Sequence, residues 1–207
     1  MRAACAAFGV AALLLAAPGQ AAESAVPREA KAYRATLVRA AHAFWGLDAP
    51  VAVFAAQIHA ESRWRANAVS PAGARGMAQF MPATAQWIAG VYPHLSGGDA
   101  FNPGWALQAL VTYDKHLWDR VEAVDSCNRM AKTLSAYNGG LGWVRRDEML
   151  ARRLGVDGAT WFGGLETVNA GRSASARREN REYPRMILLR LEPVYMRAGF
   201  GRGVCHE

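Results

Sequence analysis

The helical spacing of apolar residues is the feature that most restricts what this chain can fold into. Tyr33, Leu37, Ala41 and Trp45 recur every four residues, which places them on one face of an α-helix. The same periodicity runs through 103–118 and 143–154. The alternating apolar and polar pattern of a strand is not convincing anywhere. The sequence therefore predicts a mainly α fold.

Proline, glycine and asparagine residues predict where the helices begin and end. Helices are expected over 31–45, 50–65, 82–88, 102–118, 130–137 and 143–154, followed by an irregular segment over 155–176. A last helix is expected from about Ala176, with a bend at Pro184. Asp48 is the predicted cap of the second helix.

The first 22 residues are typical of a secretory signal peptide. Arg2 precedes the apolar run 3–16, Pro18 breaks it, and the small residues Ala21 and Ala22 follow. The run is too short to span a bilayer comfortably. We expect cleavage after Ala21 or Ala22, an exported and periplasmic protein, and no stable membrane span afterwards; a retained signal anchor is the alternative.

Export bears on the cysteines, because an oxidising compartment favours disulfides. Cys127 and Cys205 remain after cleavage, and two hypotheses stay open, a disulfide between them or two separate buried thiols. Neither has ligands at the spacing of a zinc site, so no metal is expected. The net charge of +7 favours anionic surroundings. No basic stripe interleaved with aromatic residues is present, so nucleic acid is not an expected partner.

One carboxylate, Glu61, stands in an otherwise apolar helical segment. Val51, Phe54, Ala55, Ile58 and Ser62 are predicted to form one apolar stripe of that helix, with Glu61 at its edge. Partial desolvation raises the pKa of a carboxyl group, as a general acid requires. A surface ion pair between Glu61 and Arg65, four residues later, is the competing interpretation.

Four motifs, in this order, resemble the soluble lytic transglycosylase family of the lysozyme-like superfamily. They are "AESRW" with Glu61 and Ser62, "SPAGARGMAQFMPATA" with Gly76 and Gln79, "SAYNGG" with Tyr137 and Asn138, and "ENREYPRMIL" with Tyr183. The resemblance implies a lysozyme-like single catalytic domain over 45–195, after an N-terminal segment 23–44 and before a tail 196–207. One departure is Ala78, where the family usually has Met, and a shortened substrate-contacting side chain is expected there.

The resemblance also implies a reaction on peptidoglycan glycan strands that needs no cofactor. The β-1,4 bond between N-acetylmuramic acid and N-acetylglucosamine would be cleaved with formation of a 1,6-anhydro ring, and Glu61 would act as acid and then as base. The resemblance implies that five further residues form the substrate-binding site. Gln79 and Asn138 are expected to hydrogen-bond the substrate, and Tyr137 to orient Glu61 or the sugar. Ser62 is expected to stabilise the surroundings of Glu61 or the following loop, and Tyr183 to line the cleft.

Two other functions stay open at this point. A goose-type-like muramidase would hydrolyse the same bond and would need a second carboxylate, for which Asp99 and Asp114 are the candidates. A non-catalytic wall-binding module could have kept the same fold.

Overall fold

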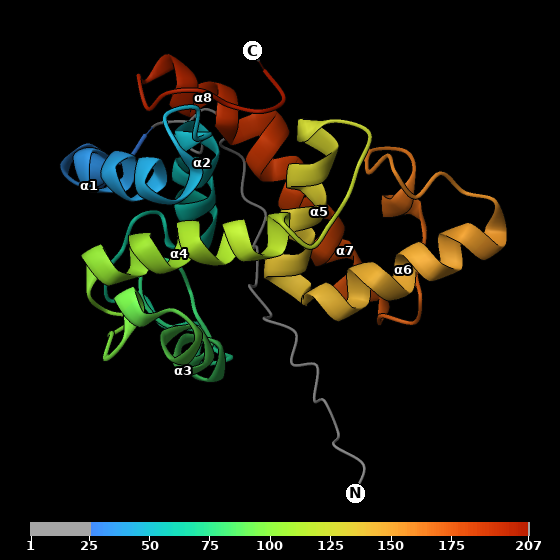
Figure 1. Ribbon diagram of the computed structural model, residues 1–207, viewed down its shortest axis with the longest axis horizontal. Coiled ribbons are helices and arrows are strands. Elements are labelled where there is room, and N and C mark those ends of the chain that lie inside the picture. The colour runs from blue at the N-terminus through green and yellow to red at the C-terminus, as the bar shows by residue number, and fades with distance from the viewer. Residues whose placement is uncertain (1–25, 207) are drawn as a thin grey trace, which may run out of the picture.

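The computed structural model describes residues 26–206, so the predicted signal peptide lies outside the described residues (Figure 1). The described part is built from helices, with two isolated β-bridges and no longer strand pairing. This confirms the predicted mainly α class. The helices are α1 (Arg28–Trp45), α2 (Val51–Ser62), α3 (Pro82–Val91), α4 (Pro103–Trp118), α5 (Ser126–Gly139), α6 (Leu141–Leu154), α7 (Ala174–Pro184) and α8 (Glu192–Arg197), with short turns at η1 (Pro93–Leu95) and η2 (Leu165–Thr167) and a π-helical stretch, η3 (Arg185–Leu191).

Helix α2 lies inside the molecule. All of its residues from Val51 to His59 are buried, since α1, α8 and η3 pack around it. The predicted single apolar stripe is therefore wrong, because the helix is covered on all sides. Burial of its aliphatic side chains stabilises the fold, at about 25 cal/mol per Å² of apolar surface removed from water.

Helix α2 also ends earlier than predicted, at Ser62 rather than near Arg65. Arg63 and Trp64 both have left-handed backbone conformations, with φ of 54° and 66°. The Trp64 side chain is buried, and its indole N–H donates to the Tyr195 hydroxyl at 2.6 Å. This anchor turns the chain out of the helix and leaves Glu61 in its last turn.

The start of α5 and the cap of α2 differ from prediction. Helix α5 begins at Ser126, since the Asp125 carboxylate accepts the backbone N–H of Asn128 at 2.7 Å. Asp48 does not cap α2. Its carboxylate binds Arg202 at 2.7 Å, and α2 follows Pro50 without a side-chain cap.

The C-terminal part passes from α7 through η3 into α8 without a loop, so the predicted bend at Pro184 is a change from α to π geometry. The tail after α8 then folds back. The buried Glu192 carboxylate accepts backbone N–H groups from Val204 and Cys205 at 2.9 and 3.0 Å. A disulfide joins Cys127 to Cys205, with their Cα atoms 4.8 Å apart, so the start of α5 is tied to this tail.

Within residues 26–206, no helix combines the length and the hydropathy needed to cross a membrane.

Candidate active site

The Glu61 carboxyl is partly buried at the end of α2. Tyr183 of α7 donates its hydroxyl to Glu61 Oε1. Burial raises the pKa of Glu61 to about 8; the Tyr183 hydrogen bond lowers it, and the nearby charge of Glu179 raises it further. A carboxyl with this pKa holds its proton at neutral pH and can act as a general acid.

The competing ion pair with Arg65 does not form. The Arg65 guanidinium Nε donates to the Ser62 carbonyl at 2.9 Å, and its side chain is exposed. In the described part of the chain, no cation forms a salt bridge with Glu61. The Tyr183 hydrogen bond favours the ionised carboxyl, but the cost of burial outweighs it.

The loop between α2 and α3 is tied down at two successive carbonyls. The buried Ser62 hydroxyl donates to the Met77 carbonyl at 2.7 Å, and the Tyr137 hydroxyl donates to the Ala78 carbonyl at 2.7 Å. Met77 and Ala78 thus connect the loop to α2 and to α5. The structure gives Ser62 a contact with the following loop, one of its two predicted roles, and no exposed hydroxyl to offer a substrate.

Gly76 and Gln79 hold the same loop in an unusual backbone conformation. Gly76 has φ of 72°, and a Cβ there would lie 1.7 Å from the Ala100 carbonyl oxygen, so a side chain cannot fit. Gln79 has φ of 51°, and its side-chain amide donates to the Gly76 carbonyl at 2.7 Å. Gln79 is partly buried, and its predicted contact with the substrate stays a prediction.

The Ala78 side chain is completely buried in the core. The expectation that a substrate-contacting side chain is shortened at this position stays a prediction. The small Ala78 side chain packs in the core beneath the loop. The Ala78 carbonyl accepts the hydrogen bond that holds the Tyr137 hydroxyl.

Tyr137 and Asn138 lie at the end of α5. Burial raises the pKa of Tyr137 well above its ordinary value, and the charges of Glu61 and Asp114 add to this, so its hydroxyl is a neutral donor. Asn138 binds α7 instead of standing free: its amide donates to Glu179 at 3.5 Å, and its oxygen accepts from Asn180 at 3.0 Å.

Glu179 is a residue near the site that the sequence interpretation missed. Burial raises its pKa, and its charge acts on Glu61. It precedes Tyr183 by four residues, a spacing that puts both side chains on one face of α7. That spacing is the signal that could have identified it.

The two carboxylates considered for a muramidase are poorly placed. Asp99 is exposed and accepts the backbone N–H of Phe101 at 2.9 Å, as part of a turn. Asp114 is completely buried on α4 and accepts a hydrogen bond from Gln57 at 3.4 Å. Burial raises the pKa of Asp114 well above its ordinary value, and its side chain is out of reach of solvent.

A family model described as the transglycosylase SLT domain matches residues 38–157. Membrane-bound lytic murein transglycosylase F of Maricaulis maris is 33% identical over 110 residues, which are 53% of this chain and 23% of that protein. The protein of the same name from Shewanella halifaxensis is 32% identical over 108 residues, 52% and 21% of the two chains. Membrane-bound lytic murein transglycosylase F 2 of Alkalilimnicola ehrlichii is 32% identical over 117 residues, 55% and 24%.

The chain spans less than a quarter of the length of these relatives. The matched segment covers more than half of the chain and contains Glu61, Gln79, Tyr137 and Asn138, whereas α7 with Tyr183 follows it. The matched family model, together with this arrangement, shows that the chain belongs to the transglycosylase SLT domain family, with its lysozyme-like fold.

Proposed function

We propose that the protein is a lytic transglycosylase that cleaves the β-1,4 bond between N-acetylmuramic acid and N-acetylglucosamine in peptidoglycan. The observation that carries this proposal is the Glu61 carboxyl, which is protonated at neutral pH and contacts one neutral donor, Tyr183. The names of the relatives, lytic murein transglycosylases, support the same substrate class.

In the proposed reaction Glu61 donates its proton to the glycosidic oxygen as the bond to the muramic C1 breaks. The 6-hydroxyl of the same muramic residue then attacks C1, and its proton passes to the Glu61 carboxylate. The products are a free 4-hydroxyl on N-acetylglucosamine and a 1,6-anhydro ring, and Glu61 is again protonated. Because the nucleophile belongs to the substrate, it is already close to C1 and no second protein carboxylate is required.

The neighbouring residues support this cycle in different ways. Tyr183 donates to Glu61, which favours the ionised form during the second half of the reaction. Tyr137 holds the Ala78 carbonyl and so fixes the loop that carries Gln79. We assign Gln79 and Asn138 to hydrogen bonds with the glycan, for which each would exchange an internal partner.

Two observations support a proposal for the compartment in which the protein acts. The first 22 residues are typical of an export signal, and the relatives are named as membrane-bound proteins that act on murein. We propose that the protein is exported and meets the glycan strands in the periplasm.

The test is the mass of the fragments released from purified peptidoglycan sacculi. The wild-type protein is expected to release anhydro-muropeptides, which are lighter by one water than hydrolysed fragments. Glu61→Gln is expected to bind sacculi and release nothing, whereas a protein that only binds the wall would give the same result with and without Glu61.

Hydrated reducing ends as the main product would contradict the proposal and would favour a muramidase. Glu179 is then the carboxylate to examine, since it is the acid whose charge reaches Glu61 from α7. In that case Glu179→Gln would abolish activity as completely as Glu61→Gln. A transglycosylase is expected to keep measurable activity in Glu179→Gln.

A further inference from the structure

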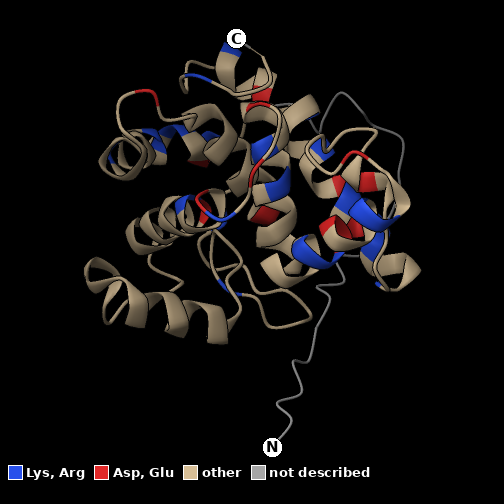
Figure 2. Ribbon diagram, turned by 45° about the vertical axis from the view of Figure 1, so that its right-hand side comes forward, with Lys and Arg blue, Asp and Glu red and all other residues tan. Residues whose placement is uncertain are grey.

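One face of α6 carries four exposed arginines. They are Arg145, Arg146, Arg152 and Arg153, and Met149, which is 53% exposed, lies between them at spacings of three and four residues. We call these five residues the α6 arginine face. Helices α1 and α6 lie at opposite ends of the molecule (Figure 1), and Figure 2 shows blue segments gathered on the side of α6.

Both acids of α6 are paired with cations from other segments, so they do not neutralise the α6 arginine face. Asp147 is buried and binds Arg172 and Arg181, and Glu148 binds Lys132 of α5 at 2.8 Å. Among the described residues, the four arginines of the face form no salt bridge. Four uncompensated charges therefore lie within about 12 Å along the helix axis, at a rise of about 1.5 Å per residue.

The stability of α6 explains only part of this arrangement. Arg152 and Arg153 lie in the last turn, where the helix dipole favours positive charge. Arg145 and Arg146 lie in the first half of the helix, where the dipole gives no such benefit. The Arg146 guanidinium lies 3.8 Å from the centroid of the Trp143 ring, a contact that fixes its position and leaves its charge unbalanced. The mutual repulsion of the four charges would be relieved by an anion from outside the chain.

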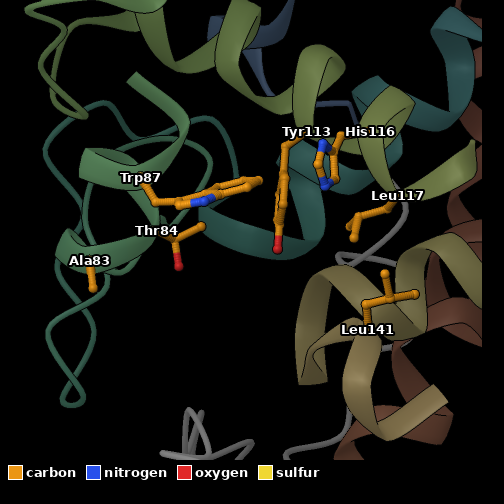
Figure 3. Close-up of a pocket in the computed structure, with 7 residues that line it drawn as sticks. All are labelled: Ala83, Thr84, Trp87, Tyr113, His116, Leu117 and Leu141. Carbon is orange, nitrogen blue, oxygen red and sulfur yellow. The ribbon is translucent and has the colours of Figure 1, made fainter. Parts of the chain in front are cut away.

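The α6 arginine face is separate from the pocket next to the candidate active site. That pocket, of about 320 Å³, reaches α6 only at Leu141, which lies across from Trp87 and Tyr113 (Figure 3). None of the five residues of the face lines it. An exposed helix face is convex and encloses no volume, so it suits a broad anionic surface better than a small anionic ligand.

The side chains of the face match the two layers of a lipid surface. Guanidinium groups bind phosphate through paired N–H donors, and the exposed Met149 offers an apolar side chain that can enter the boundary below the headgroups. We propose that the α6 arginine face binds the surface of a bilayer that contains anionic phospholipids, with α6 lying in the plane of that surface. This contact is independent of the reaction assigned to Glu61.

The experiment measures cosedimentation with vesicles of phosphatidylglycerol and phosphatidylcholine in equal parts, and with vesicles of phosphatidylcholine alone. The protein is recovered from the periplasm of expressing cells, and mass spectrometry checks that every variant has the same N-terminus. Arg152→Gln/Arg153→Gln is compared with Arg28→Gln/Lys31→Gln, which removes the same charge from two exposed residues of α1. Circular dichroism checks that each variant is folded.

The parent is expected to bind the anionic vesicles and not the neutral ones. Arg152→Gln/Arg153→Gln should bind about 25-fold more weakly, at about fivefold for each arginine near an anionic bilayer. Arg28→Gln/Lys31→Gln should change little, because salt screens charges at the far end of the molecule. Met149→Ser should weaken binding about fivefold, the apolar contribution of a half-exposed side chain.

Three results would overturn the proposal: no binding to anionic vesicles, equal binding to both vesicle types, or an equal loss in the two double variants. The peptidoglycan wall is the other broad anionic surface. If Arg152→Gln/Arg153→Gln in the Glu61→Gln background lost affinity for purified sacculi and kept its affinity for vesicles, the face would belong to wall binding instead.

Failure of this contact and failure of the proposed function are distinguishable. Arg152→Gln/Arg153→Gln is expected to release anhydro-muropeptides from sacculi at the rate of the parent while it loses vesicle binding. Vesicle binding that depends on these arginines, without anhydro products from the parent, would keep the contact and refute the reaction.

Discussion

The raised pKa of Glu61 predicts that this residue lowers the unfolding free energy at neutral pH. Its pKa rises from 4.5 to about 8 in the folded protein. Between these values the folded state binds a proton that the unfolded state has released, so the unfolding free energy falls as pH rises. The wild-type disadvantage is absent below about pH 4.5 and complete above about pH 8.

The size of the effect follows from the shift. Each pH unit inside this window contributes about 1.4 kcal/mol, so at pH 7 the wild-type protein loses about 3 kcal/mol relative to a chain with a neutral group at this position. Glu61→Gln supplies such a group with nearly the same shape, and its amide can still accept the Tyr183 hydrogen bond.

The assay is urea unfolding of wild type and Glu61→Gln at pH 4.5, 6 and 7.5, with the disulfide intact in both. The variant is expected to match the wild type at pH 4.5 and to be increasingly more stable at the two higher values. Since all other groups titrate in both proteins, their contributions cancel in the difference. A difference that stays constant with pH, or a wild type that is more stable at pH 7.5, would refute the assignment of a raised pKa to Glu61.

Three further predictions concern the residues around this carboxyl. Tyr183→Phe removes a donor that favours ionised Glu61, so the pKa rises above 8 and the alkaline limb of the kcat/KM profile moves to higher pH; an alkaline limb that stays in place or moves to lower pH would contradict it. Ser62→Ala leaves the Met77 carbonyl without its partner and is expected to lower the unfolding free energy by about 1–3 kcal/mol, with thermal unfolding as the measurement. Gly76→Ala places a methyl group against a backbone oxygen at φ of 72°, and a loss of at least about 3 kcal/mol is expected; a melting temperature like that of wild type would show that the loop can move aside.

The placement of most helices was predictable because it depends on neighbouring residues. The spacing of Tyr33, Leu37, Ala41 and Trp45 appears as α1, and Asn102 before Pro103 caps α4 by accepting the Trp105 backbone N–H. The end of α2 was not predictable in this way. The left-handed turn at Trp64 depends on a hydrogen bond to Tyr195, 131 residues later.

Within the candidate site, the sequence by itself predicted Glu61 as the general acid, together with its motif neighbours, because few residue types can donate a proton and the four motifs stand in one order along the chain. The surroundings of Glu61 came only from tertiary structure. Burial of α2 on all sides raises its pKa, and the Tyr183 hydrogen bond crosses 122 residues of chain. The burial of Ala78 and the proximity of Glu179 to Glu61 also depend on tertiary structure. Local spacing assigns a side chain to a face of its own helix, but which face becomes interior, and which distant charge meets it there, is decided by how the helices pack.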